Sequence, residues 1–324
     1  MIELHCPYCC HSLKISESVA YCEACSYQLK NEDGVWIDVS LSQETQDKNF
    51  YESVYSKEKG AHWLQGLNRD NFFKRLLEKI SLSYRRERFF KHYLKGKQKK
   101  ILDLACGAGR DYFKNYGEVV GVDLIKGPLI IAKKNYQQVI QAGISSLPFP
   151  DNYFDYVVSS DIFGHIRLQD KDNIIKEILR VLKPGGLTLH VIETDSTNVW
   201  FRMAHGRPEL FQKYFIEQIG GHVGLELPSQ CVSRWQHNGF MMVKVIKIWG
   251  LIWPIQDYAG LFDNKYQQGS IFLHCVVTIS KILSKYRLIK IGINIILNPI
   301  NYLIELFWPL DNGQGIMMVC KKSL

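Results

Sequence analysis

Four cysteines near the amino terminus have the spacing of metal ligands. They form two Cys-x2-Cys pairs that are separated by twelve residues, namely Cys6, Cys9, Cys22 and Cys25. Two such turns present four thiolates to one tetrahedral Zn²⁺ ion, so the pattern predicts a structural zinc ribbon over residues 1–40. Three neighbours remain open as substitute ligands: Cys10, His5 and His11.

A second chemical motif is ILDLACGAGRD, residues 101–111, in which a buried strand runs into a glycine-rich turn. Turns of this kind bind nicotinamide cofactors, flavins or S-adenosylmethionine. The third glycine of the dinucleotide pattern is missing here. Asp103 lies inside the motif instead, and Asp123 closes the next strand, where it can accept hydrogen bonds from both hydroxyls of a ribose. Gly107 and Gly109 allow close backbone approach, so the turn also suits a cofactor without phosphates.

Strand and helix patterns alternate from residue 99 onward. The expected strands cover residues 100–105, 118–123, 138–142, 155–161, 187–193, 240–249 and 315–322, with a helix over 172–183. This alternation predicts an α/β fold with a doubly wound, mostly parallel seven-stranded sheet. Ligands bind such sheets beyond the carboxyl ends of the strands.

Taken in order, the motifs resemble those of class I S-adenosylmethionine-dependent methyltransferases, specifically the type 11 group that includes quinone-biosynthesis enzymes. Four matches carry the resemblance: LDLACGAGRD (102–111), VVGVDLI (119–125), SSLPFPDNYFDYVVSSD (145–161) and EILRVLKPGGLTLHV (177–191). The first forty residues resemble zinc ribbons fused to several bacterial methyltransferases of this group. The resemblance implies a Rossmann-like fold and S-adenosylmethionine as cofactor.

The resemblance also assigns roles to single residues. The expected cofactor-binding set is Asp103, Ala105, Cys106, Gly107 and Gly109 around the methionine part, Asp123 and Leu124 at the ribose, Ile144 and Ser145 beside the adenine, and Ser160 facing the reacting centre. The chain departs from the family pattern twice. Ala105 replaces the first glycine of the motif. Gly143 stands where the family usually has an aspartate that touches the adenine amino group, so we expect looser adenine recognition.

Methyl transfer to a hydroxyl or an acidic carbon is helped by a general base. His165, just past the fourth strand, is the best-placed candidate, and Asp161, His205 and His222 are further ones. An equally weighted alternative is that His165 only covers the cofactor. We expect Cys106 to be small and buried, with no covalent role.

The sequence says less about the methyl acceptor than about the cofactor. The segment after the fourth strand, SSDIFG, lacks the motifs of adenine, cytosine-amino and RNA C5 methylation. The segment Tyr84–Lys100 carries eight Lys and Arg against Glu87 alone, which is either a solvated helix face or a patch for an anion such as RNA. An apolar, aromatic and basic insert at about 250–312 is either a helical lid or a surface that takes a lipid-like substrate from a membrane, with Lys281, Lys285, Arg287 and Lys290 near headgroups.

The 324 residues are thus expected to form a zinc ribbon (1–40), a linker and helical lid segment (41–96) and a methyltransferase domain (97–324). The start MIELHCPYCC lacks a secretory pattern and no apolar run reaches 18 residues, so we expect a cytoplasmic protein, peripheral at a membrane at most. The predicted activity is O- or C-methylation of a small-molecule or lipid-like acceptor. The alternatives are an RNA methyltransferase and a non-catalytic cofactor-binding scaffold whose ribbon contacts a protein partner; a nicotinamide dehydrogenase is a distant third.

Overall fold

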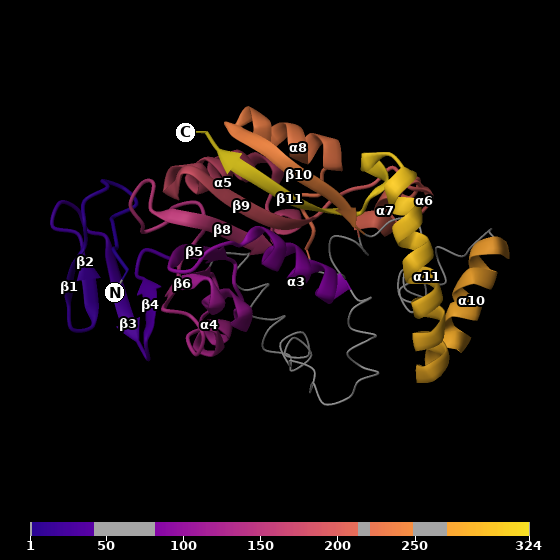
Figure 1. Ribbon diagram of the computed structural model, residues 1–324, viewed down its shortest axis with the longest axis horizontal. Helices are drawn as coiled ribbons and strands as arrows, with labels where there is room; N and C mark the ends of the chain where they lie inside the picture. Colours follow the sequence, from indigo (N-terminus) through magenta and orange to yellow (C-terminus); the bar gives the residue numbers. More distant parts are fainter. Residues whose placement is uncertain (1, 42–81, 213–220, 249–270, 324) are drawn as a thin grey trace.

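The computed structural model describes residues 2–41, 82–212, 221–248 and 271–323 (Figure 1). Its centre is an 11-stranded sheet in the order β1-β2-β3-β4-β7-β6-β5-β8-β9-β11-β10. The four amino-terminal strands lie at one end of the molecule, and helices α10 and α11 lie at the other.

Seven strands make up the part of the sheet expected from the alternating pattern. They are β5 (Lys99–Leu104), β6 (Gly117–Asp123), β7 (Gln138–Gln141), β8 (Phe154–Ser160), β9 (Leu182–Glu193), β10 (Phe240–Ile248) and β11 (Gly315–Lys322). The first five pair in parallel, and their central residues are buried on both faces, as parallel strands between two helical layers must be. Strand β11 runs antiparallel between β9 and β10. The predicted Rossmann-like core is confirmed.

The predicted sheet was too small by four strands. Strands β1 (Lys14–Ser16), β2 (Val19–Tyr21), β3 (Gln28–Glu32) and β4 (Val35–Asp38) form an antiparallel meander. Strand β4 then pairs in parallel with β7, Trp36 opposite Ile140 and Ile37 opposite Gln141. Leu29 and Trp36 are buried in the same core cluster as Ile140. The amino-terminal segment therefore extends the main sheet, because its apolar face is covered by the rest of the chain.

Helices cover both faces of the sheet, namely α3 (Leu82–Tyr93), α4 (Lys126–Ala132), α5 (Leu168–Val181) and α8 (Pro228–His237). The other described helices are α6 (Val199–His205), α7 (Pro208–Phe211), α10 (Ile271–Lys285) and α11 (Arg287–Phe307), and the 3-10 turns are η2 (Asp111–Asn115), η3 (Phe163–His165) and η5 (Leu310–Asn312). The helix expected over 172–183 begins four residues earlier and ends at Val181. It ends there because Leu182 already pairs with Phe154 in the parallel ladder of β8 and β9.

Two predicted segments fall partly outside the described residues. Of the expected lid over 41–96, the structure describes residue 41 and residues 82–96, which include α3. The start of the apolar insert, residues 249–270, is not described. The described part of the insert is helical, and Pro299 lies within α11. Among the helices of the described ranges, none has both the length and the apolarity to cross a bilayer.

Candidate functional site

The glycine-rich turn follows β5 at the carboxyl edge of the parallel strands. Ala105, Gly107 and Gly109 all have positive φ, of 50°, 54° and 75°. A Cβ atom on Gly107 would meet nothing within 4 Å, whereas on Gly109 it would lie 2.9 Å from the Tyr136 ring. Gly107 thus borders open space that a ligand could fill, and Gly109 is needed for packing.

Asp123 ends β6 beside this turn and is only 7% exposed. Its Oδ2 accepts a hydrogen bond from the Gly107 backbone N–H at 2.8 Å, and its Oδ1 accepts one from Ile125 at 2.9 Å. A carboxylate has about four acceptor positions, so acceptor capacity remains for hydroxyl groups. Burial raises the pKa of Asp123, against the opposing effect of the backbone donors. The side chain of Gln141 donates to the Leu124 carbonyl at 3.0 Å, which fixes the position of Leu124 after Asp123.

Asp103 is buried beneath the turn. Burial raises its pKa to about 6, opposed by the charge of Arg110 and by a hydrogen bond from the Tyr136 hydroxyl. Cys106 packs over the strand at Gly121, where a Cβ atom would lie 2.7 Å from its Sγ. Burial raises the pKa of the Cys106 thiol well above its usual value, so the thiol stays protonated, which supports the expectation of a packing role.

The end of β8 carries Ser160 and Asp161. The Ser160 hydroxyl donates to the Asp161 carboxylate at 3.0 Å. Asp161 has a φ of 61° and forms a bidentate ion pair with Arg86 of α3, one bond of which measures 2.7 Å. The guanidinium neutralises the carboxylate that the sequence proposed as a base. The sequence indicated Arg86 only as part of the basic segment Tyr84–Lys100, with nothing to pair it with Asp161.

Two of the histidine candidates meet at the same edge of the sheet. The rings of His165, in η3, and His222, before α8, stack with centroids 4.4 Å apart. Glu193, the last residue of β9, completes the group, and the possible ligand atoms of all three lie within 4.8 Å of one another. Burial, reinforced by the Asp161 carboxylate, raises the pKa of Glu193 well above its usual value. The sequence-based candidates did not include Glu193. An acidic residue at the end of the strand next to β8 is the sequence signal that indicates it.

The fourth candidate lies elsewhere. His205 of α6 is partly exposed and pairs with Asp195 at 2.8 Å. It also stacks on Phe211. The structure therefore brings His165 and His222 together and leaves His205 outside the group.

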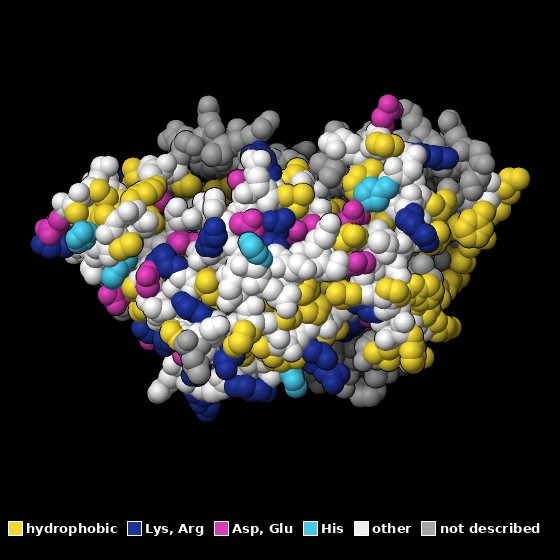
Figure 2. All heavy atoms as spheres, turned by 90° about the horizontal axis from the view of Figure 1, so that it is seen from above, with side chains coloured by type: hydrophobic (Ala, Val, Ile, Leu, Met, Phe, Trp, Pro, Cys, Tyr) yellow, Lys and Arg dark blue, Asp and Glu magenta, His cyan; other side chains and the backbone are white. Residues whose placement is uncertain are grey.

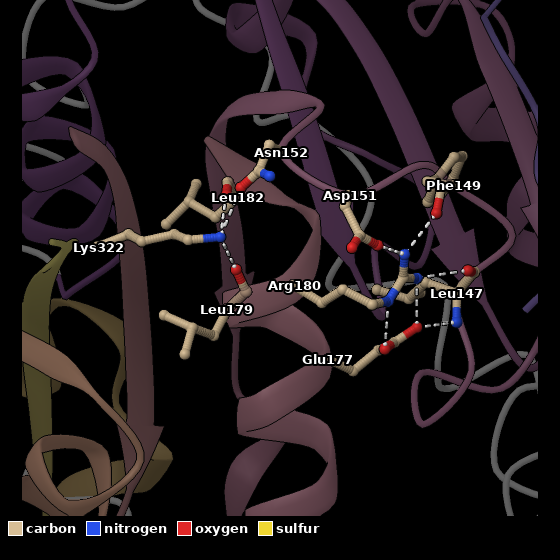
Figure 3. A network of polar contacts seen from close by, with 9 residues as sticks. All are labelled: Leu147, Phe149, Asp151, Asn152, Glu177, Leu179, Arg180, Leu182 and Lys322. Atoms are coloured by element: carbon tan, nitrogen blue, oxygen red, sulfur yellow. Dashed lines mark hydrogen bonds and ion pairs between the residues drawn. The ribbon is translucent and has the colours of Figure 1, made fainter. Parts of the chain in front are cut away.

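The residues expected beside the adenine lie in the loop after β7. Ile144 is half-buried and Ser145 is exposed. A Cβ atom on Gly143 would meet only the Ser145 hydroxyl, 4.0 Å away, so space next to it is open. The loop continues into residues 147–151, which the helix α5 holds in place (Figure 3).

That anchoring centres on one arginine of α5, Arg180. Arg180 pairs with Glu177 at 2.7 Å and with Asp151 at 2.7 Å. The same guanidinium donates to the carbonyls of Leu147 and Phe149, and Glu177 accepts from the Leu147 N–H at 2.6 Å. In Figure 3 these groups converge on the loop from α5, while Lys322 of β11 binds the other side of the helix end. Glu177 and Arg180 of EILRVLK thus position the loop over residues 147–151.

A cavity of about 230 Å³ lies between α6 and α11. Its lining comes from α6 and the residue before it, β10, α11 and the residues after α11: Asn198, Val199, Arg202, Lys247, Ile304, Glu305, Trp308, Asn312 and Gly313. The α11 side of this cavity is tied to α3, since Arg85 pairs with the buried Glu305 at 2.8 Å.

The four cysteines of the expected zinc ribbon converge. The Sγ atoms of Cys6 and Cys25 are 3.3 Å apart, as are those of Cys9 and Cys22. All four lie within 4.8 Å of one another, and the other three candidates, Cys10, His5 and His11, are not in this group. Of the candidate metal ligands, only Cys6, Cys9, Cys22 and Cys25 therefore converge on one point.

The chain matches known proteins across the glycine turn and the sheet that holds it. The methyltransferase-domain family matches residues 102–190. A demethylmenaquinone methyltransferase of Geobacillus kaustophilus is 30% identical over 158 residues, which are 40% of this chain and 67% of that protein. The chain belongs to the methyltransferase-domain family. A demethylmenaquinone methyltransferase of Bacillus licheniformis is 35% identical over 125 residues, 35% of this chain and 50% of the relative. The chain spans about half the length of most curated relatives that it matches.

Solved structures of this family share the fold. Haemonchus contortus phosphoethanolamine N-methyltransferase 2 superposes with a TM-score of 0.52 at 17% identity, covering 88% of this chain and 62% of that one. A chain of the Haloferax volcanii complex between the Trm112 methyltransferase activator and a methyltransferase gives 0.51 at 14% identity, covering 86% and 98%. At these identities the likeness establishes the fold alone.

Proposed function

We propose that the chain is an S-adenosylmethionine-dependent methyltransferase that methylates oxygen or carbon of a small-molecule or lipid-like acceptor. The observation that carries the proposal is the open space at Gly107, whose backbone N–H donates to the adjacent carboxylate of Asp123. The similarity to demethylmenaquinone methyltransferases supports the same reaction class.

The residues present fit the cofactor. Bound S-adenosylmethionine supplies a methyl group on a positively charged sulfonium. The remaining acceptor positions of Asp123 suit the two ribose hydroxyls. Asp103 places a titratable carboxyl beneath the methionine part, and the Gly143–Ser145 loop leaves room for the adenine. The chain contributes orientation and exclusion of water, which are the main requirements of an in-line displacement.

The acceptor side is assigned to the edge of β8 and β9. Ser160 and the Arg86–Asp161 pair border the reacting centre, and the His165–Glu193–His222 group is the source of any proton-accepting or acceptor-orienting function. The cavity between α6 and α11 then offers an apolar extension for the rest of the acceptor.

A lipid-like acceptor is favoured by the surface of α10 and α11. Hydrophobic side chains gather over this end of the molecule in Figure 2. The most exposed of them are Ile271, Phe272, Ile279, Ile282, Tyr286, Ile296, Leu303, Leu306 and Phe307. Lys281 and Lys285 are exposed on α10. An apolar helical face with basic residues beside it is typical of proteins that contact a lipid interface.

The basic segment offers less support for RNA. Arg85 pairs with Glu305, Arg86 with Asp161, and Lys91 with Glu87. Lys99 pairs with Asp155, and Lys100 lies over the Tyr153 ring. Much of the positive charge thus stabilises the fold.

We also infer that the four clustered cysteines bind Zn²⁺. Tetrahedral coordination with Zn–S bonds of about 2.3 Å places sulfurs about 3.8 Å apart. The described Sγ separations of 3.3 and 3.8 Å are close to that value.

The test incubates the purified protein with methyl-labelled S-adenosylmethionine and an extract of its source cells, then separates organic-soluble, RNA and aqueous small-molecule products. We expect label in the organic phase with the native chain and little with Asp123→Asn. Label in RNA would contradict the proposed acceptor. Cofactor binding without any S-adenosylhomocysteine would favour the scaffold, and a rise in melting temperature with NADH alone would favour a dehydrogenase.

A further inference from the structure

The group of His165, Glu193 and His222 has the composition of a divalent-cation site. Two imidazoles and one carboxylate on one face are the ligands of many open mononuclear sites for first-row metals. Each residue offers one atom, and these atoms lie within 4.8 Å of one another. Bonds of about 2.1 Å require ligand separations of about 3 to 3.5 Å, so small rotations about side-chain bonds suffice to close the site.

Glu193 is placed to act as a ligand. Its Oε2 atom is buried and forms no hydrogen bond with any part of the chain that the structure describes. Buried carboxylate oxygens are rarely left in this state without a strong partner. A cation between the two rings would supply one.

The backbone between the ligands is packed to bring them together. A Cβ atom on Gly164 would lie 3.0 Å from the His222 ring and 3.4 Å from Glu193 Oε2. The absence of that side chain lets the histidine and the carboxylate approach over the η3 turn. A glycine at this position is therefore a requirement of the group's geometry.

The three segments that carry the ligands are also tied to one another. The Gly224 N–H donates to the Gly164 carbonyl at 3.0 Å, which joins the His222 loop to η3. Lys171, which is buried, donates to the Gly224 carbonyl at 2.7 Å and pairs with Glu226 at 2.8 Å. The Asp195 N–H donates to the Glu226 carbonyl at 3.0 Å, which joins the same loop to the end of β9. The segments that carry the ligands are therefore tied together by the chain itself, so only side-chain rotations are needed to complete the site.

We propose that His165, Glu193 and His222 bind one divalent cation of the class that prefers nitrogen and oxygen ligands. Three protein ligands leave positions open for water or for oxygen atoms of the acceptor. The role of the cation, to orient and acidify an acceptor hydroxyl, rests on the methyl transfer proposed above. Binding of the cation does not rest on it.

The test measures metal binding rather than turnover. Full-length protein that retains its zinc is freed of loosely held metal and dialysed to equilibrium with Mn²⁺ and, separately, with Ni²⁺. Thiolate sites disfavour Mn²⁺, so the cysteine group does not contribute to that measurement. We expect one bound ion per chain, with affinity reduced at least tenfold in His222→Ala and Glu193→Gln. The matched control is His237→Ala, an exposed histidine of α8, which should bind as the native chain does.

Binding of S-adenosylmethionine and thermal unfolding, measured on the same samples, report whether each variant is folded. The proposal is overturned if neither ion binds the native chain more tightly than folded His222→Ala, or if His237→Ala loses as much affinity. Methyl transfer is assayed independently, so its absence would overturn the proposed function while a positive metal result stood.

Discussion

The hydroxyl of Tyr136 donates a 2.5 Å hydrogen bond to the buried carboxyl of Asp103 and accepts one from the Arg110 backbone at 2.7 Å. One phenol therefore fixes both the start and the end of the glycine turn. Its ring also fills the space that a side chain on Gly109 or Gly121 would need. The turn is held from below by a residue that lies outside the family motif.

The environment of Asp103 predicts a pH dependence of stability. Its pKa is raised from 3.8 to about 6, mainly by burial. The folded chain then holds a proton that the unfolded chain loses, so this contribution to the unfolding free energy falls as pH rises from about 4 to about 6. Relative to Asp103→Asn, the native chain should lose roughly 1–3 kcal/mol over that range. Urea unfolding at a series of pH values measures the difference.

Tyr136→Phe provides the companion variant. The lost hydroxyl removes a hydrogen bond that lowers the pKa of Asp103, so the decline should extend to higher pH. If the unfolding free energies of the native chain and Asp103→Asn change with pH in parallel, then the pKa of Asp103 is not raised in the folded protein.

The positive φ of Ala105 predicts that Ala105→Gly stabilises the folded protein. Its φ of 50° lies in the left-handed region, where an L-residue with a Cβ atom is strained by about 1–2 kcal/mol. Ala105→Gly relieves that strain but adds freedom to the unfolded chain, so we expect a net gain of roughly 0.5–1 kcal/mol in unfolding free energy. The matched control is Ala108→Gly in the same turn, where φ is not positive and stability should fall. A loss of stability in Ala105→Gly would refute the strain argument.

The open space at Gly143 predicts that an aspartate there raises the affinity for S-adenosylmethionine. Its φ is not in the left-handed region, and a Cβ atom has open space around it. Gly143→Asp should add an acceptor for the adenine amino group and tighten S-adenosylmethionine binding about three- to tenfold, as measured by calorimetry. Gly143→Ala, which lacks the acceptor, should leave affinity unchanged.

The same gain should vanish for S-inosylhomocysteine, whose base lacks the amino group. If Gly143→Asp tightens the binding of both the adenine and the inosine ligands, then the adenine side of the pocket has been assigned to the wrong loop.

The sequence predicted the glycine turn and its acids because their function depends on local order. Gly107 and Asp123 lie at strand ends, and the strands themselves are recognisable from buried runs. The partners of three further residues could not be assigned in this way. Arg86 lies 75 positions from Asp161, and Tyr136 lies 33 from Asp103. Glu193 meets His222 only because the loop before α8 folds back over β9.

The sequence did not predict that β1–β4 extend the central sheet, for a similar reason. Alternation of apolar and polar residues indicates a strand but does not name the strand's neighbour. The pairing of β4 with β7 joins Trp36 to Ile140, about a hundred residues later. Spacing identified the four cysteines that converge, but nothing in that spacing indicated that their segment extends the central sheet.

This pairing predicts that the cysteine site and the methyltransferase core unfold together. A structural Zn²⁺ contributes folding free energy to the segment that binds it. Here that segment shares a hydrogen-bonded ladder and a hydrophobic core with β7, and His5 donates its N–H to the Pro148 carbonyl at 3.1 Å in the adenine-side loop. Cys22→Ser should therefore lose zinc and lower the melting temperature of the whole chain in a single calorimetric transition. Cys10→Ser, an exposed cysteine outside the group, should change neither. Two separate transitions in Cys22→Ser, only one of them shifted from its position in the native chain, would mean that the segment is an independent unit.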